Sequence, residues 1–254
     1  MFDFPDIPKI VYSRNFLRSS IFNIEFEETI SWQLHSEAIQ NLFKDEFPIK
    51  NNKLSIDVNF TKNSKDELSL KTDTSFFELK SLDNLNVLAF ENNVVAILFH
   101  GKSYQSFQNF ERLFNLINEK LIEKELSKYK IKKFSERKIN LIDFATPINN
   151  GLSFLKQLIN SQLVGNIDYV PNSNFIKQSI NSIVFEDDNA LLDIKYGYNK
   201  INNDIGQIIL DMVLFVNVDK SLTYFENFEK INTVLYRAFH WAITDEYKQI
   251  LNGK

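Results

Sequence analysis

FIKQSINSIVFE (175–186) is the first of three strand-like runs in succession that decide the fold. The other two are ALLDIKYGY (190–198) and QIILDMVLFVNV (207–218). Aliphatic, β-branched and aromatic residues dominate each run, and a short polar segment, 187–189 or 199–206, separates it from the next. Strands joined by short turns pair antiparallel with their neighbours. We therefore expect an antiparallel three-stranded meander in this part of the chain.

A long helix is expected directly after the meander. Apolar residues recur there at intervals of three and four, the spacing that keeps them on one helix face. The residues of this stripe are Phe225, Phe228, Ile231, Leu235, Ala238 and Ala242. Before the meander, the patterns predict a strand at RKINLIDF (137–144) and a helix at GLSFLKQLINSQL (151–163).

The same order of elements is predicted earlier in the chain. SIFNIEFEE (20–28) alternates like a half-buried strand, and a helix with Thr29 or Ser31 as its N-cap should follow. The apolar stripe of that helix is Ile30, Leu34, Ala38 and Leu42. Further strands are expected at 54–60, 75–81, 86–91 and 94–100, the last two joined by a tight turn at Asn92-Asn93. A second long helix carries the stripe Phe107, Phe110, Phe114, Ile117 and Leu121.

These patterns predict an α+β protein built by tandem duplication of a strand–helix–three-strand–long-helix unit of about 115 residues. Each half would form an antiparallel sheet packed on long helices. The expected halves are residues 1–129 and 130–254, which can together form one compact domain. The basic segment KYKIKKFSERK (128–138) marks the join between them.

Composition limits the classes of function. The 254 residues are 44% hydrophobic and include 24 Phe, which is ample for a large core. The absence of Cys excludes disulfides, thiol catalysis and thiolate metal sites, and a net charge of −4 argues against duplex DNA as a partner. The longest apolar stretch, VVAILF (94–99), is far shorter than the roughly 20 residues of a membrane span, and the opening lacks the pattern of a signal peptide. We expect a cytoplasmic protein with no membrane partner.

Several short motifs in order carry a resemblance to a known family. They are Tyr12, Asn15, Leu17, Ile21 and Phe26 in the opening, DEFP (45–48), SYQSFQNF (103–110), LDM (210–212) and the ending FHWAITDEY (239–247). With these motifs the chain resembles a sporadically distributed, uncharacterised bacterial family of about this length. Phe16, Ser19-Ser20, Glu136 and Lys138 depart from that family's pattern. The resemblance implies no particular reaction. It implies a gene neighbourhood of mobile elements, toxin–antitoxin systems or antiphage defence.

The histidines do not predict a metal site. His35, His100 and His240 lack the short local ligand pair that usually seeds a zinc site, so neither a metal nor a cofactor is expected. In the ending FHWAITDEY, we expect Phe239 to be buried and His240 to lie off the apolar stripe, toward the surface. Thr244 should N-cap a last helical turn.

Asp211 is the second candidate for a polar site. It lies among the aliphatic residues of a predicted strand, and a buried carboxylate requires a partner. Lys195 is a suitable basic side chain, and structural pairing is a simpler explanation than catalysis. His240 and Asp211 are therefore the candidate polar residues, and no residue is predicted to be catalytic.

The basic segment 128–138 is the candidate contact surface. Its candidate contact residues, for nucleic acid or for a protein partner, are Lys128, Lys130, Lys132, Lys133 and Arg137. Tyr129 and Phe134 lie between these charges, so the segment combines charge with the stacking surface that single-stranded nucleic acid requires. A solvated linker between the two halves is the favoured interpretation.

Two classes of function stay open. The first is a non-catalytic binding or assembly protein of a bacterial module, such as antiphage defence or toxin–antitoxin. Its partner would be a protein encoded nearby or a second copy of the chain. The alternative is an enzyme acting on nucleic acid or nucleotide, with a site assembled from distant strands. The absence of a compact catalytic motif favours the first, and nucleic acid is not the favoured partner.

Overall fold

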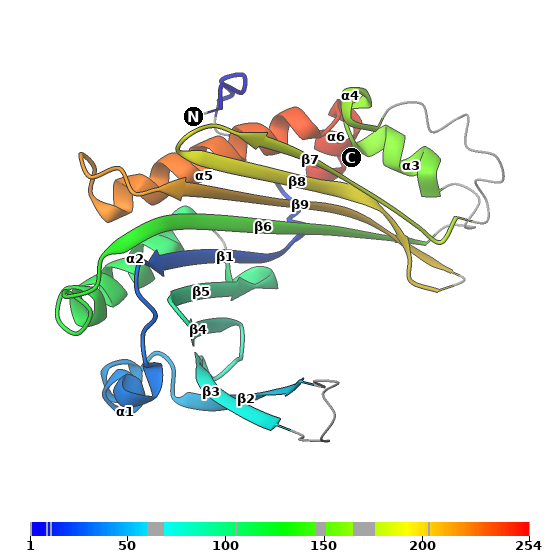
Figure 1. Ribbon diagram of the computed structural model, residues 1–254. Helices are drawn as coiled ribbons and strands as arrows, with labels where there is room; N and C mark the ends of the chain where they lie inside the picture. The colour runs from blue at the N-terminus through cyan, green and yellow to red at the C-terminus, as the bar shows by residue number, and fades with distance from the viewer. Residues whose placement is uncertain are drawn as a thin grey trace, which may run out of the picture. The chain divides into compact units, whose positions relative to one another are not determined.

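A computed structural model of the chain describes residues 2–8, 10, 12–59, 69–104, 106–145, 151–164, 176–202 and 204–253, without the side chains of 53–59, 69–75 and 151. The fold is α+β, as predicted, and its strands form one antiparallel sheet (Figure 1). The strand order is β2-β3-β4-β5-β1-β6-β9-β8-β7. The last residue of the predicted strand 54–60 lies outside the described residues, as do residues 61–68.

The described strands are β1 (Leu17–Phe26), β2 (Ile49–Asn59), β3 (Ser69–Lys80), β4 (Asn86–Glu91), β5 (Val94–His100), β6 (Ile131–Ala145), β7 (Gln178–Glu186), β8 (Ala190–Lys200) and β9 (Ile205–Asn217). The described helices are α1 (Trp32–Phe43), α2 (Phe107–Ile117), α3 (Gly151–Leu158), α4 (Ser161–Val164), α5 (Tyr224–Ala242) and α6 (Asp245–Leu251). A 3-10 turn, η1 (Gly101–Ser103), precedes α2, and a π-helical turn, η2 (Asn118–Ile122), follows it. The predicted meander and both predicted long helices are confirmed. In the described residues, no helix is both long and apolar enough to cross a membrane.

The prediction of separate sheets is wrong, because β1 and β6 are internal strands of a single sheet. In two separate sheets, each of these strands would leave an open edge of unpaired backbone groups. The predicted duplication is not evident either. Four strands, β2 to β5, follow α1, whereas three, β7 to β9, follow α4. The expected halves 1–129 and 130–254 stay a prediction.

Residues 22–133 form one of two compact units. Its core is aromatic: Phe22 of β1 stacks on Phe110 of α2 with ring centroids 3.7 Å apart, and the fully buried Trp32 lies 5.2 Å from Phe90. Of the predicted turn, Asn92 has a positive φ of 50°, which confirms a tight connection between β4 and β5.

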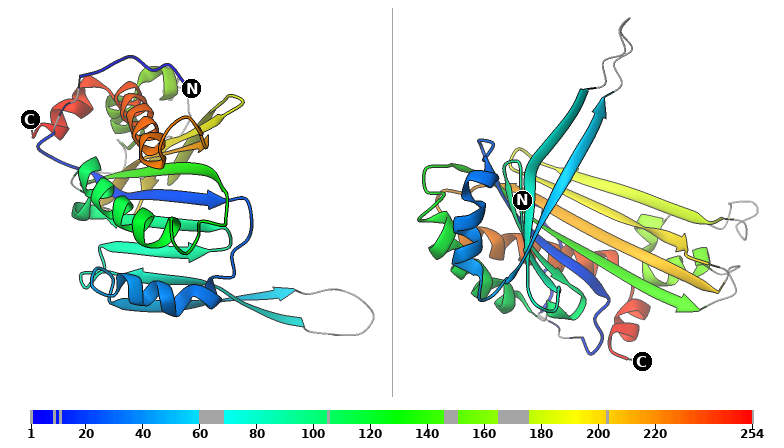
Figure 2. Two further views of the ribbon diagram at one scale, coloured as in Figure 1. Left: turned by 90° about the vertical axis from the view of Figure 1, so that its left-hand side faces the viewer. Right: turned by 90° about the horizontal axis from the view of Figure 1, so that it is seen from below.

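The other compact unit combines residues 1–21 with 134–254. α5 packs against β9, and α3 packs against β8, β9 and α6. The helices of this unit therefore lie on one side of its strands (Figure 1 and Figure 2). Even-numbered side chains of β8 and β9 face these helices and are buried, among them Leu192, Ile194, Leu210, Met212 and Leu214. Odd-numbered side chains of the same strands face the opposite side.

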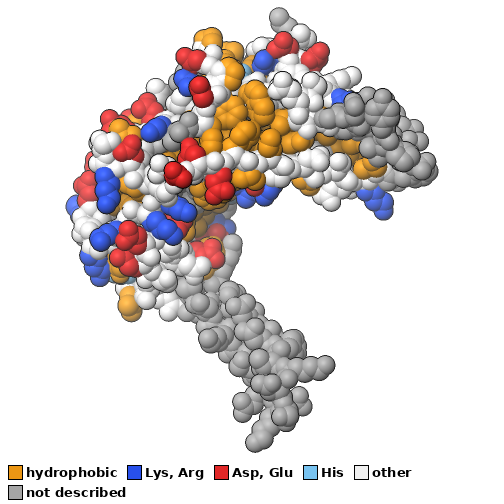
Figure 3. Space-filling model, turned by 45° about the horizontal axis from the view of Figure 1, so that its top comes forward, with side chains coloured by type: hydrophobic (Ala, Val, Ile, Leu, Met, Phe, Trp, Pro, Cys, Tyr) orange, Lys and Arg blue, Asp and Glu red, His pale blue; other side chains and the backbone are white. Residues whose placement is uncertain are grey.

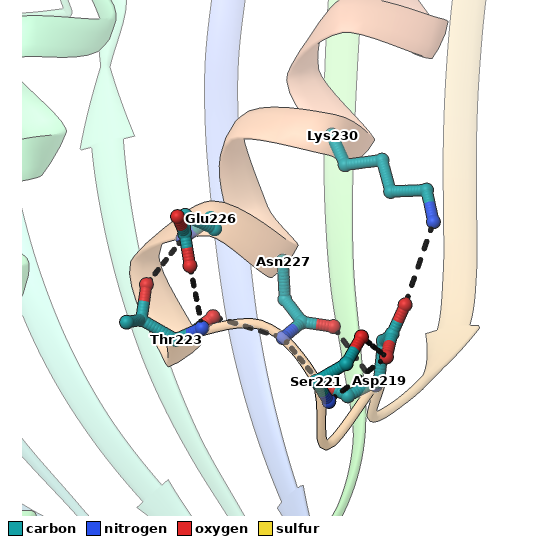
Figure 4. Close-up of polar contacts among 6 residues, drawn as sticks. All are labelled: Asp219, Ser221, Thr223, Glu226, Asn227 and Lys230. Carbon is teal, nitrogen blue, oxygen red and sulfur yellow. Dashed lines mark hydrogen bonds and ion pairs between the residues drawn. The ribbon is translucent and has the colours of Figure 1, made fainter.

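Side-chain hydrogen bonds fix the start of α5. Thr223 and Glu226 form a capping box, in which each side chain accepts a hydrogen bond from the other residue's backbone N–H (Figure 4). Asn227 is buried and donates to the carbonyl oxygens of Asp219 and Thr223. The loop that leads into the helix is therefore tied to its first turn, with Lys230 adding an ion pair to Asp219 at 3.7 Å.

The predicted stripe of α1 is wrong. Leu34 is 84% exposed, whereas Trp32, Ile39 and Phe43 are the buried residues of the helix. The aromatic side chains at the two ends of α1 therefore determine which face turns inward, in place of the predicted Leu34, Ala38 and Leu42. Of the predicted stripe, only Ile30, which precedes the helix, is buried. Ser31 occupies the N-cap position but makes no side-chain cap hydrogen bond.

The two stripes of α1 can be separated by a pair of substitutions. Ile39→Ala should lower the free energy of unfolding by about 2–5 kcal/mol, because it leaves a cavity in a fully buried place. Leu34→Ala should change it by less than about 0.5 kcal/mol, because the side chain is exposed. Urea unfolding followed by circular dichroism measures both. A larger loss for Leu34→Ala would restore the predicted stripe.

Candidate functional site

His240 is buried in the unit formed by 1–21 and 134–254. Its side chain is 3% exposed, and its Nδ1 lies 3.2 Å from the hydroxyl of Tyr12. The ring of Tyr236 lies 4.5 Å away. The prediction that His240 faces the surface is therefore wrong, as is the prediction that Phe239 is buried, since Phe239 is only half-buried. The N-terminal segment covers the side of α5 that the helix pattern alone assigns to solvent.

The environment of His240 keeps both members of the pair neutral at neutral pH. Burial, with Lys248 as a second cause, lowers the pKa of His240 to about 4. Burial, followed by Tyr236 and Asp245, raises the pKa of Tyr12 to about 12. A general base works best with a pKa near the operating pH. The pair is therefore better suited to holding the N-terminal segment against α5 than to proton transfer.

Thr244 is the N-cap of α6, as predicted. Its hydroxyl accepts a hydrogen bond from the backbone N–H of Tyr247 at 3.2 Å and donates one to the carbonyl oxygen of Gln157. Ile243 and Tyr247 are buried, and Asp245 lies in the first turn of the helix. The ending is thus a capped helical turn that is tied to α3.

Asp211 of β9 is paired with Arg137 of β6, not with the predicted Lys195. The guanidinium holds the carboxylate with two hydrogen bonds, Nε to Oδ1 at 2.8 Å and Nη2 to Oδ2 at 2.5 Å. Lys195 instead forms an ion pair with Asp193 at 3.2 Å. Asp193 also accepts a hydrogen bond from the hydroxyl of Ser182 at 2.5 Å. These charges form a row of mutually satisfied partners, and the bond to Asp211 raises the pKa of Arg137.

His240 and Asp211 do not lie together. Asp211 is one of the odd-numbered residues of β9, whose side chains point away from the helices, whereas His240 belongs to a helix. The two residues are therefore on opposite sides of the strands.

The basic segment is a strand and not a solvated linker, because residues 131–138 belong to β6. Its strand character is hidden by charge: Phe134 is buried against Phe228, with ring centroids 4.6 Å apart, and it directly follows the exposed Lys132 and the half-buried Lys133. Lys132 forms an ion pair with Glu25 at 3.1 Å, and the ammonium of Lys128 lies 5.0 Å from the ring centroid of Tyr129.

Glu136 is a buried charge whose position no local pattern predicts. It is fully buried, its Oε1 lies 3.1 Å from Nζ of Lys138, and that ammonium donates to Asn232 of α5 at 2.6 Å. Burial raises the pKa of Glu136, and Lys138 opposes this effect. The only sequence signal is that Glu136 and Lys138 are two residues apart and so share one face of a strand.

The open face of β7, β8 and β9 carries an exposed apolar surface. Its most exposed apolar side chains are Ile180 (46%), Val184 (54%), Ile205 (37%) and Phe215 (36%). Leu191, Ile209 and Val213 lie half-buried on the same face. We call these seven residues the open-face surface. Figure 3 brings forward the top of the view in Figure 1, where the helices of this unit lie, and shows hydrophobic side chains gathered there beside charged ones.

No family model matches the chain, and no match was found among curated proteins. Among the side chains that the structure describes, no three of His, Asp or Glu gather as metal ligands would. The function therefore has to be inferred from the chemistry of the described residues.

The buried His240 makes the stability of the fold depend on pH. Because the pKa of its imidazole falls from 6.5 to about 4 on folding, the unfolded chain binds a proton that the folded chain does not. The stability is present above about pH 6.5 and is lost as the pH falls toward 4. His240→Gln should reduce this slope, whereas His35→Gln, on the half-exposed part of α1, serves as the matched control. Urea unfolding at several pH values in this range measures how the free energy of unfolding of each variant depends on pH. Equal slopes for wild type and His240→Gln would contradict the assignment.

Proposed function

We propose that the chain is a non-catalytic binding protein, which holds a protein partner on the open-face surface. One observation carries the proposal: β9 has apolar side chains on both of its faces, yet among the described residues helices cover one face only. A sheet with one solvated face normally alternates apolar with polar residues, and strands that are apolar on both sides are typical of sheets covered on both sides.

The chemistry of this surface suits a protein partner. Phe215 supplies an aromatic side chain, and the aliphatic residues around it supply apolar area, which are features of the centre of a protein interface. The ion pairs of Arg137 with Asp211 and of Lys195 with Asp193 are already satisfied within the chain. A partner can therefore cover them without leaving an unpaired charge. Contiguous exposed apolar patches on soluble proteins commonly mark interaction sites.

The biological setting is also part of the proposal. The resemblance of the opening and closing motifs supports membership of the sporadically distributed bacterial family, and with it a role in a module such as antiphage defence or toxin–antitoxin. A cytoplasmic location is consistent with the absence of a membrane-crossing helix among the described residues. An enzyme acting on nucleic acid is the weaker proposal, because Arg137 and Lys132 of the basic segment are engaged by acidic side chains.

Photo-crosslinking in the host cell tests partner binding. Phe215→benzoylphenylalanine should give a light-dependent adduct with another protein, because residue 215 lies within the open-face surface. Leu34→benzoylphenylalanine, at an 84% exposed position of α1, is the matched control and should give none. Electrophoresis and mass spectrometry of the adduct measure both. No adduct at residue 215, or the same adducts at both positions, would contradict the proposal.

A further inference from the structure

The two ends of the sheet differ in how they are protected. Terminal strands expose unpaired backbone groups that can pair with another chain, and proteins usually block them with Lys, Pro or bulges. β2 has such features: Lys50 and Lys53 lie on it, and its register with β3 shifts between Lys53 and Ser55. β7 contains no Lys, Arg or Pro, and its register with β8 runs without interruption from Gln178 to Glu186. Among the residues that the structure describes, β7 is thus the terminal strand left open for pairing.

The free backbone groups of β7 belong to its even-numbered residues. Asp187 N–H donates to the carbonyl of Ala190, and Lys200 N–H donates to the carbonyl of Lys177, so odd-numbered residues bond to β8. Bonding alternates along an antiparallel strand, so the even-numbered residues point their N–H and C=O groups to the free edge. These residues, Gln178, Ile180, Ser182, Val184 and Glu186, are all exposed. Their side chains also lie on the open face, because their register partners are odd-numbered residues of β8.

The sequence of β7 is complementary to itself about Ser182. If a second copy pairs antiparallel with Ser182 opposite Ser182, then Ile180 lies opposite Val184 and Gln178 opposite Glu186. Each of the five even-numbered residues then faces another one, which gives about ten backbone hydrogen bonds. The two exposed apolar side chains, Ile180 and Val184, would bury each other across the joint.

Charge adds a second complementarity. Exposed Lys177 precedes β7, whereas Glu186 ends it and the exposed Asp188 follows. Antiparallel pairing brings the basic start of one copy beside the acidic end of the other, twice in one dimer. A parallel pairing would instead place Lys177 beside Lys177 and Glu186 beside Glu186, which is repulsive.

We propose that the chain forms a two-fold symmetric homodimer in which β7 pairs antiparallel with β7 of a second copy about Ser182. The dimer joins two sheets into one continuous sheet through an isologous contact. It goes beyond the proposed binding of a partner, because it requires only this chain.

Sedimentation of the purified full-length chain tests the dimer. Wild type should sediment as a dimer that dissociates on dilution. Ser182→Pro should be monomeric, because it removes an outward N–H that β8 does not use. The double variant Ile180→Lys/Val184→Lys should also be monomeric, since it places like charges opposite each other across the joint. If circular dichroism shows that Ser182→Pro does not fold, the sedimentation of the double variant tests the dimer instead. Phe215→Lys, on β9, should remain dimeric and so separates this proposal from the binding of a partner.

The register can be tested by disulfide formation, because the chain contains no Cys and a single introduced thiol can only pair with a second copy. Ser182→Cys should form a covalent dimer on oxidation, since the two residues lie opposite each other. Gln178→Cys is the matched control and should not, because its counterpart lies eight residues further along the paired strand, or about 27 Å away. A monomeric wild type, a dimer that survives both β7 variants, or equal oxidation at both positions would overturn the proposal.

Discussion

Among the described residues, helices pack on one face only of the strands in the unit formed by 1–21 and 134–254, and the rest of this unit depends on that constraint. Helices α3 and α5 take the even-numbered side of β8 and β9, where Leu192, Leu210 and Met212 are almost completely buried. In the described part of the chain no helix packs on the odd-numbered side, yet on β9 that side carries Ile205, Ile209, Val213 and Phe215. Charges on that side include two matched pairs, Arg137 with Asp211 and Lys195 with Asp193. The core and the candidate interface are thus two faces of the same strands.

Alternation and helical spacing predicted the individual elements well. The three strands of the meander, α2 and α5 lie where those patterns place them, and the Thr244 cap is confirmed. Alternation within a strand does not predict which strands are neighbours in the sheet. The β1 and β6 strands look like the starts of two independent sheets, but each is an internal strand of one sheet. Sequence order therefore suggested a duplication that the arrangement of the strands does not make evident.

The errors at single residues have related physical causes. His240 was assigned to the surface because helical spacing considers one helix alone, whereas Tyr12, 228 residues away in sequence, covers it. The Arg137–Asp211 pair likewise joins residues 74 positions apart, so no local motif predicts it. Charges concealed the first half of β6, since a strand that begins with Lys132 and Lys133 resembles a solvated linker. Contacts between distant segments decide each of these cases.

The N-terminal segment lies on the last two helices, and this has a consequence for synthesis on the ribosome. Phe4 contacts Trp241, Tyr12 bonds to His240, and the backbone of Arg14 donates to Leu251. Residues 22–133 form a unit that is continuous in sequence, so it can complete its contacts while the rest is still being translated. Residues 4–14, by contrast, must wait until residues 240–251 have been made before they can form these contacts. Such long-range contacts form slowly, and Phe4 stays uncovered until α5 has been made.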